Sequence, residues 1–191
     1  MKNLKITIVL LAIFIVVPEM TVFGQDSDTP KKYDKVSAYK EDGFALVQLG
    51  SKVGLIDKSG KEVVPCKYDR INGTTIIYNN AYLSVYFVDG FVGVLLDGKW
   101  GYVAQDGNEI TPMKYDEIRP FCDSMASVVY DRKRGYIDTS GKEVIPCRYD
   151  GAGDFDNGIA SVQTGNKWIY IDKQGNEYAT KKAAQKTVQK K

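Results

Sequence analysis

The chain of 191 residues contains no histidine, the residue that serves most often as a general base and as a metal ligand near neutral pH. This absence excludes catalysis by a serine–histidine or cysteine–histidine pair. The sequence also has no large excess of charge of either sign, because 26 lysines and arginines nearly balance 24 aspartates and glutamates. The sequence therefore lacks the basic excess that predicts a nucleic-acid partner, and we expect none.

Long hydrophobic runs are limited to one apolar stretch near the N-terminus, residues 6–17. Lys2 and Lys5 precede it and Gly24 follows it, which is typical of a secretory signal peptide. The run is shorter than the ~20 residues that a bilayer-spanning helix needs. We predict a signal peptide over residues 1–24, with a retained N-terminal anchor as the alternative, and no transmembrane segment once it is removed. The mature chain is expected to be exported, as a periplasmic, cell-surface or secreted protein.

Proline is sparse, with 6 residues against 13 tyrosines and 18 glycines, a balance that favours strands joined by tight turns. After a polar linker at residues 25–32, a Tyr-Asp pair recurs four times and divides the chain into repeat units. These units span residues 33–67, 68–114, 115–148 and 149–178. The second unit is longer because of an insertion near residues 72–87, which is itself strand-like, with Asn79 and Asn80 as a candidate turn.

Each unit carries the same three strand signals. The first strand alternates, so that residues such as Ala45 and Val47 share one face, which we expect to be the core. A short hairpin turn leads to the second strand, and an Asp-x-x-Gly turn leads to the third. The third strand contains Pro65, Pro112 or Pro146, which marks its end or a sheet edge. We predict an all-β fold of three-stranded antiparallel meanders stacked as an open array. Propeller-like closure is the alternative, although propeller blades usually have four strands.

Three cysteines, Cys66, Cys122 and Cys147, cannot all pair within one chain. Cys66 and Cys147 occupy the same position two units apart, so stacking would separate their Cα atoms by more than the roughly 7 Å that a disulfide tolerates. Free thiols packed as small hydrophobic groups are favoured, with a disulfide of Cys122 as the alternative. Residues 179–191 contain five lysines and no acid, and we expect a solvated tail, or alternatively a segment that binds anionic envelope lipid or polymer.

The repeating residues resemble a known family. Residues 99–102 read Lys-Trp-Gly-Tyr and are followed by variants of Asp-x-x-Gly-Lys-Glu-Val-Val-Pro and Tyr-Asp, as in the WG-containing (KWG) repeat of bacterial proteins. Trp100 and Gly101 form the complete signature, whereas Gly54 and Gly135 lack the tryptophan before them and Ile169 replaces the glycine after Trp168. The resemblance covers residues 33–178. It implies a β-rich scaffold of surface or exported proteins, without an assigned activity.

Neither a metal site nor a cofactor is predicted. Each Asp-x-x-Gly turn supplies one carboxylate, whereas Ca²⁺ takes 6 to 8 oxygen ligands. One glutamate also recurs per unit, as Glu62, Glu109, Glu143 and Glu177. Because these residues occupy equivalent positions, a structural role in every unit, such as pairing with a neighbouring lysine, explains them better than the paired carboxylates of a glycan hydrolase. We therefore expect a protein that is not an enzyme.

The second strands carry the candidate binding residues on one face. These residues are Trp100, Tyr102, Arg134, Tyr136, Trp168 and Tyr170. Such a face suits sugar rings or an extended segment of a partner protein. The alternative is that the neighbouring unit covers it, because repeat units bury one face on their neighbours. The predicted function is an exported, non-enzymatic module that binds a protein or glycan at the cell envelope, with a structural spacer or a glycan hydrolase as alternatives.

Overall fold

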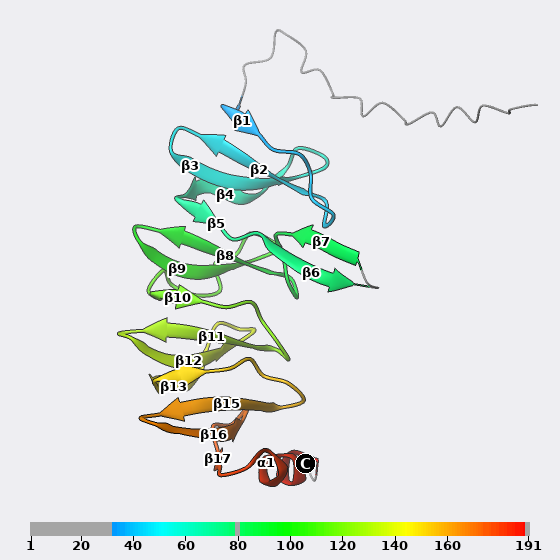
Figure 1. Cartoon of the computed structure of the whole chain (residues 1–191). Coiled ribbons are helices and arrows are strands. Elements are labelled where there is room, and N and C mark those ends of the chain that lie inside the picture. The colour runs from blue at the N-terminus through cyan, green and yellow to red at the C-terminus, as the bar shows by residue number, and fades with distance from the viewer. Residues whose placement is uncertain (1–31, 79–80, 190–191) are drawn as a thin grey trace, which may run out of the picture. The chain divides into compact units, whose positions relative to one another are not determined.

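The computed structural model describes residues 32–78 and 81–189. The predicted signal peptide, nearly all of the linker, and the candidate turn at Asn79 and Asn80 lie outside these residues. The described residues form one compact unit built of small antiparallel sheets that follow one another in chain order (Figure 1). The all-β open array is therefore confirmed. Within the described residues, no helix has the length and apolar content that crossing a membrane requires.

The first unit forms sheet 1, with β1 (Lys35–Val36), β2 (Phe44–Leu49), β3 (Lys52–Asp57) and β4 (Glu62–Tyr68). The second forms sheet 2, with β5 (Arg70–Ile71), β8 (Phe91–Leu96) and β9 (Lys99–Ala104). The third forms sheet 3, with β10 (Glu117–Ile118), β11 (Met125–Tyr130), β12 (Lys133–Asp138) and β13 (Glu143–Tyr149). The fourth forms sheet 4, with β14 (Gly151–Ala152), β15 (Ile159–Thr164), β16 (Lys167–Asp172) and β17 (Glu177–Tyr178).

The insertion in the second unit is a separate two-stranded hairpin of β6 (Thr74–Tyr78) and β7 (Ala81–Val85). It leaves sheet 2 directly after β5 and returns before β8, so it branches from the side of the array (Figure 1). Asp42 of sheet 1 holds its returning end, because one carboxylate oxygen accepts hydrogen bonds from the backbone N–H groups of Tyr86 at 2.6 Å and Phe87 at 3.0 Å.

Each sheet also begins with a two-residue strand that the sequence did not predict. This strand follows the Tyr-Asp pair directly, as at Tyr68, which ends β4, and Arg70, which begins β5. The backbone N–H of Asp69 already donates to the carbonyl oxygen of Leu95 in β8. The Tyr-Asp pair is therefore the junction at which the chain leaves one sheet and joins the next.

The core lies between successive sheets, so both faces of an inner sheet are covered. Leu55 of β3 clusters with Val92 and Val94 of β8, which belong to the following sheet. The same arrangement joins sheets 2 and 3, and sheets 3 and 4. The face predicted to be core is buried, with Ala45 and Val47 both at 0% exposure. The neighbouring sheet also covers the opposite face, which period-two alternation alone does not predict.

The turns follow the predicted chemistry. Two-residue hairpin turns contain residues with positive φ, such as Asp97 and Gly98 at 51° and 76°. In the turn after β3, the Asp57 carboxylate accepts hydrogen bonds from the backbone N–H groups of Ser59 at 2.8 Å and Lys61 at 3.1 Å, and Gly60 adopts a φ of 82°. These local bonds fix the path from the second strand to the third.

The signature glycine allows the third strand to approach the second closely. A Cβ atom added to Gly135 would lie 2.5 Å from the carbonyl oxygen of Ile145 and 2.7 Å from the nitrogen of Cys147. The pairing of β12 with β13 shifts register at this point, as it does at Gly54 in sheet 1. In sheet 4, β17 pairs only with Tyr170 and Ile171, so no third strand crosses Ile169. The exception at Ile169 therefore has a structural reason.

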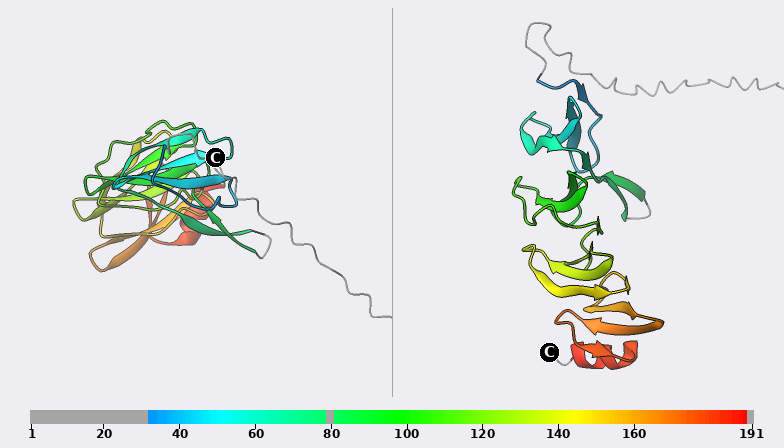
Figure 2. Two further views of the ribbon diagram at one scale, coloured as in Figure 1. Left: turned by 90° about the horizontal axis from the view of Figure 1, so that it is seen from above. Right: turned by 90° about the vertical axis from the view of Figure 1, so that its left-hand side faces the viewer.

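The lysine-rich end of the chain differs from the expected solvated tail. Residues Lys181–Val188 form helix α1, which contacts β15, β16 and β17 of sheet 4 (Figures 1 and 2). Thr180 is the N-cap, since its side chain accepts a hydrogen bond from the N–H of Ala183. Ala184 is fully buried. The capping threonine and the alanines are helix signals that the charge of the lysines had obscured.

Candidate functional site

The junction tyrosines join each unit to its neighbour. Tyr68, Tyr115 and Tyr149 are buried between sheets, and the hydroxyl of Tyr68 donates to Glu109 at 2.8 Å. Burial and the bond to Glu109 raise the pKa of Tyr68. The recurring glutamates also form ion pairs with a lysine or arginine, in the pairs Lys32–Glu62, Lys67–Glu109, Lys114–Glu143 and Arg148–Glu177. Their expected role in every unit is therefore confirmed.

The junction aspartates bridge two sheets. Asp69 accepts from Lys52 Nζ at 2.6 Å in sheet 1, and its other oxygen accepts from the backbone N–H of Asp97 at 2.8 Å in sheet 2. Asp116 and Asp150 bind Lys99 and Lys133 in the same way. The hydrogen bond from each lysine holds the pKa of its aspartate below the ordinary value. We call each lysine–aspartate–turn arrangement a junction clamp.

The clamps predict that the stability of the array depends on acid pH. A lowered aspartate pKa in the folded state contributes stability above the unfolded value near 3.9, and this contribution is lost as the pH falls through the lowered pKa. The melting temperature should therefore drop below about pH 4. Asp116→Asn should make this drop shallower, and a melting series between pH 6 and pH 2 measures both curves. Identical slopes for the two proteins would show that the clamp at Asp116 does not contribute.

The six candidate binding residues do not form one exposed face. Tyr102 and Tyr136 are buried, and their hydroxyls donate to the carbonyl oxygens of Arg119 and Gly153. Stacking of the following sheet covers both rings, so the two tyrosines form no exposed aromatic face. Burial raises the pKa of both tyrosines.

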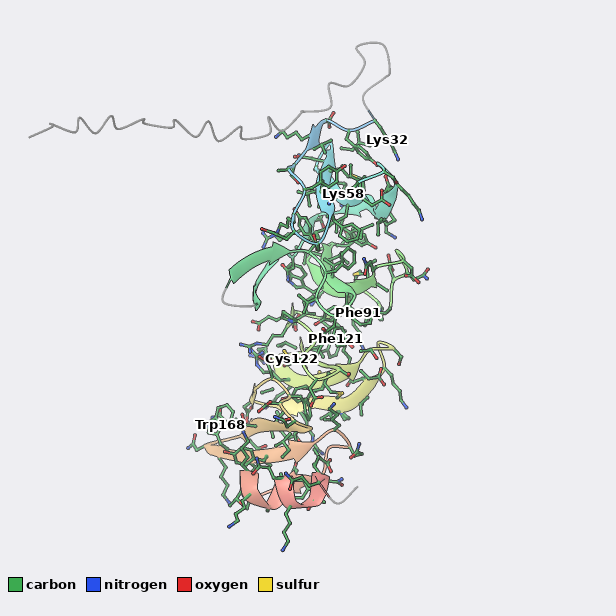
Figure 3. All side chains as sticks on the ribbon, turned by 90° about the vertical axis from the view of Figure 1, so that its right-hand side faces the viewer. Lys32, Lys58, Phe91, Phe121, Cys122 and Trp168 are labelled. Atoms are coloured by element: carbon green, nitrogen blue, oxygen red, sulfur yellow. The ribbon has the colours of Figure 1, made fainter. Side chains whose placement is uncertain are left out.

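The other four candidates differ in exposure. Trp100 and Tyr170 are half-buried, and Trp100 packs in the cluster between sheets 2 and 3. Arg134 is also half-buried and forms an ion pair with Glu117 at 2.9 Å. Trp168 is 55% exposed, and its ring lies beside Gly151, where an added Cβ would be 3.1 Å from the ring (Figure 3). Trp168 is thus the candidate that the structure leaves most open.

A pocket of about 210 Å³ opens between sheets 2 and 3, beside the base of the β6–β7 hairpin. Asn72, Gly73 and Tyr86 line it where the insertion begins and ends. Its remaining lining residues come from sheet 2 and from the junction with sheet 3, and they are Val88, Phe91, Gly93, Tyr102, Ile118, Arg119, Pro120 and Phe121. Figure 3 shows Phe91 and Phe121 next to one another, with ring centroids 4.6 Å apart. The pocket therefore combines aromatic walls with polar groups at Asn72 and Arg119.

Gly93 distinguishes this place from the other units. It pairs with Tyr102 in sheet 2, whereas the equivalent pairs are Leu46 with Leu55, Ser127 with Tyr136, and Ser161 with Tyr170. An added Cβ would lie 2.5 Å from Cδ1 of Ile118, a side chain that lines the pocket. The sequence analysis identified the insertion near residues 72–87 but not a pocket beside it, and it did not single out Gly93.

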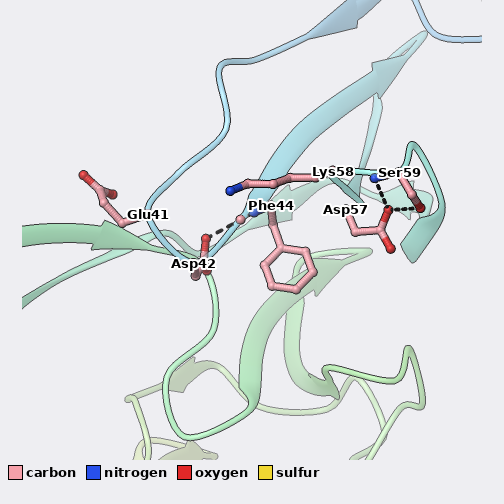
Figure 4. A pocket seen from close by; sticks show the side chains of 7 residues that line it. Glu41, Asp42, Phe44, Asp57, Lys58 and Ser59 are labelled. Atoms are coloured by element: carbon pink, nitrogen blue, oxygen red, sulfur yellow. Dashed lines mark hydrogen bonds between the residues drawn. The ribbon is translucent and has the colours of Figure 1, made fainter.

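A second hollow, of about 430 Å³, lies on sheet 1 among Glu41, Asp42, Gly43, Phe44, Asp57, Lys58 and Ser59 (Figure 4). Two of its carboxylates already accept hydrogen bonds from backbone N–H groups. Asp42 accepts from Tyr86 at the end of the insertion, and Asp57 accepts from Ser59 within its own turn. The bond from Ser59 lowers the pKa of Asp57. We therefore place the candidate site at the pocket between sheets 2 and 3.

The described residues hold no group of three or more metal-ligating side chains. All three cysteines are free and half-buried. Burial raises the pKa of Cys147 to about 11, which lowers the fraction of the reactive thiolate at neutral pH. The cysteines thus have the environment of small packing groups.

Among solved structures, the chain is similar to a protein of unknown function from Bacteroides caccae, at 14% sequence identity and a TM-score of 0.28. The match covers 78% of this chain and 60% of that protein, so this chain spans less than two thirds of its length. No curated protein matches the chain.

The profile of the WG containing repeat matches residues 29–52, 54–75, 100–133 and 135–168. These segments include Trp100 and Gly101 and together cover more than half of the chain. They also contain the clamp lysines or aspartates of every sheet junction. The chain belongs to the WG-containing repeat family.

Proposed function

We propose that this protein is an exported, non-enzymatic repeat protein that binds a partner protein at the cell envelope through the pocket between sheets 2 and 3. The observation that carries the proposal is the position of the insertion. The β6–β7 hairpin is the largest departure from the repeat, and Asn72 and Tyr86, at its two ends, line the pocket. A structural array alone has no need of this hairpin or of the space at Gly93.

The size and lining of the pocket favour one apolar side chain of a partner as its occupant. Its 210 Å³ lies below the roughly 300–1,000 Å³ of sites that enclose drug-sized ligands and cofactors. Tyr86, Phe91 and Phe121 supply aromatic surface, which dominates the energetics of protein interfaces. Arg119 can contribute a polar contact at the edge of the pocket, since its ion pair with Asp154 is exposed and therefore weak.

Export and the lack of catalysis are the other parts of the proposal. Residues 1–24 support export by their signal-peptide pattern. The absence of histidine and the ion pairs of the recurring glutamates support a non-enzymatic role. A structural spacer remains the second candidate, because the junction tyrosines and clamps recur so regularly.

Capture from envelope fractions tests the pocket against the exposed tryptophan. Gly93→Ser introduces the residue that sheets 3 and 4 carry at this position and narrows the pocket against Ile118. A partner that occupies the pocket should be recovered about tenfold less by this variant than by the wild type, as expected when about 1.4 kcal/mol of contact is lost. Quantitative mass spectrometry of the captured proteins measures the recovery.

Trp168→Ala is the matched control, because it removes an exposed aromatic side chain from a different sheet. A partner lost with Trp168→Ala and retained with Gly93→Ser would move the binding site to sheet 4. A specific partner that both variants recover in full would place the binding site elsewhere, and the absence of any specific partner would favour the spacer.

A further inference from the structure

The upper face of each sheet is the face that packs on the preceding sheet, and the lower face is the one that packs on the following sheet. Sheet 1 has no preceding sheet among the described residues, so its upper face has the residues of such an interface without the partner sheet. Val36 and Tyr39 stand three and six residues after the junction tyrosine Tyr33, as Ile118 and Phe121 stand after Tyr115. Phe121 is 2% exposed between sheets 2 and 3, whereas Val36 and Tyr39 are 49% and 44% exposed. Apolar positions that the array buries at its inner junctions are thus open on sheet 1.

The junction clamp is also half complete at sheet 1. Asp34 accepts a hydrogen bond from the backbone N–H of Gly50 at 2.6 Å, as the other junction aspartates do from their turns. At the inner junctions the second oxygen binds a lysine of the preceding sheet. Between residues 32 and 189, apart from 79 and 80, no lysine forms an ion pair with Asp34.

The lower face of sheet 4 carries the residues that a preceding sheet would present to sheet 1. Lys167 occupies the position of Lys52, Lys99 and Lys133, and in the same described ranges it has no carboxylate partner. The neighbouring Trp168 is exposed, whereas its equivalent Trp100 packs against the following sheet. Sheet 4 therefore offers the lysine and the aromatic side chain that sheet 1 lacks.

Helix α1 occupies the place of a following sheet. It lies under sheet 4 at the end of the stack in Figure 1 and contacts three of the four strands of this sheet, β15, β16 and β17. The packing of α1 on sheet 4 is limited, because Ala184 is the one buried residue of the helix and its ion pair, Lys181 with Asp156, spans 3.9 Å. An eight-residue helix is marginal in isolation, so loss of this packing would release it.

We infer that the lower face of sheet 4 is an interaction surface for sheet 1 of a second copy of this chain, and that α1 acts as a cap that blocks it. Docking would pair Lys167 of one copy with Asp34 of the other and would cover Val36 and Tyr39 with the second strand of sheet 4. Such head-to-tail contacts leave a free end on each copy, so assembly would be open-ended. The wild type, with α1 in place, stays monomeric.

A pair of substitutions on neighbouring alanines tests the cap. Ala184→Asp places a carboxylate in the buried contact and should displace α1, whereas Ala183→Asp puts the same side chain on the exposed face of the helix. In sedimentation velocity over a range of concentrations, Ala184→Asp should form a growing series of oligomers, and the wild type and Ala183→Asp should remain monomers. Oligomers of the wild type, or a monomeric Ala184→Asp variant that keeps its folded β-sheet spectrum, would overturn the inference.

Charge exchange distinguishes specific docking from aggregation of a damaged protein. Adding Lys167→Asp to Ala184→Asp places a carboxylate at position 167 of one copy opposite Asp34 of the other copy. This repulsion should weaken association by at least about tenfold. Adding Asp34→Lys as well restores an opposite pair and should recover the oligomers. Oligomers that ignore Lys167→Asp would show that the contact lies elsewhere and would overturn the assignment of both faces.

Discussion

Replacing Gly135 with alanine is expected to destabilise the array by about 3 kcal/mol, at the upper end of what an overpacked core position costs. The reason is a backbone obstacle. The added Cβ would lie 2.5 Å from the Ile145 carbonyl oxygen and 2.7 Å from the Cys147 nitrogen, and neither atom can move without breaking the pairing of β12 with β13. Urea unfolding, followed by far-ultraviolet circular dichroism, measures the change.

Gly101→Ala provides the matched control at the equivalent position of sheet 2. There the nearest atoms are the sulfur and methyl carbon of Met113 and the Thr111 hydroxyl, all in side chains. Because the Met113 side chain is flexible, we expect a cost of about 1 kcal/mol or less. Equal losses for the two variants would mean that the glycine is needed for a reason other than the close approach of the third strand.

Phe155→Ala is expected to lower the free energy of unfolding by about 4 kcal/mol, as is typical when a buried phenylalanine leaves a cavity. Phe155 is 3% exposed between sheets 3 and 4, and its ring meets that of Tyr136 edge-on at 4.8 Å. The measurement is again urea unfolding, followed by far-ultraviolet circular dichroism and by the combined fluorescence of Trp100 and Trp168.

Tyr39→Ala changes the equivalent position of sheet 1, where the side chain is 44% exposed. We expect a loss below about 1 kcal/mol, since little apolar surface is returned to water. The contrast between the two variants measures how much stability a complete inter-sheet junction contributes. A similar cost at both positions would contradict the open face of sheet 1 at Tyr39.

Most of the fold could be predicted from residues whose local chemistry is restrictive. Gly60, Asp57 and the hairpin residues Asp97 and Gly98 dictate turns wherever they stand, so the strand order of each unit followed from them. The two-residue strands after each Tyr-Asp pair were not predictable, because Lys35 and Val36 carry no alternating pattern and join the sheet through the backbone alone.

The candidate site was harder to predict for a physical reason. Tyr102, Tyr136 and Tyr170 occupy equivalent strand positions, yet the first two are buried and Tyr170 is half-buried, because a following sheet covers only the first two. The exposure of these side chains therefore follows from how the sheets stack and cannot be predicted from the sequence of a single strand. The pocket likewise depends on the absence of a side chain at Gly93, which appears in the sequence as an ordinary strand glycine.

The junction at each Tyr-Asp pair has a consequence for how such a chain changes over evolutionary time. Because Tyr115 and Tyr149 each end one sheet and introduce the next, the segment between them carries an upper face that packs on its predecessor and a lower face that packs on its successor. An in-frame duplication of residues 115–148 would therefore meet matching surfaces on both sides. Loss of the same segment would bring sheet 4 against sheet 2 with a tyrosine, an aspartate and a lysine still in place. The number of units is thus free to vary by recombination, while residues found in one unit alone, such as Gly93, cannot be replaced by copying a neighbour.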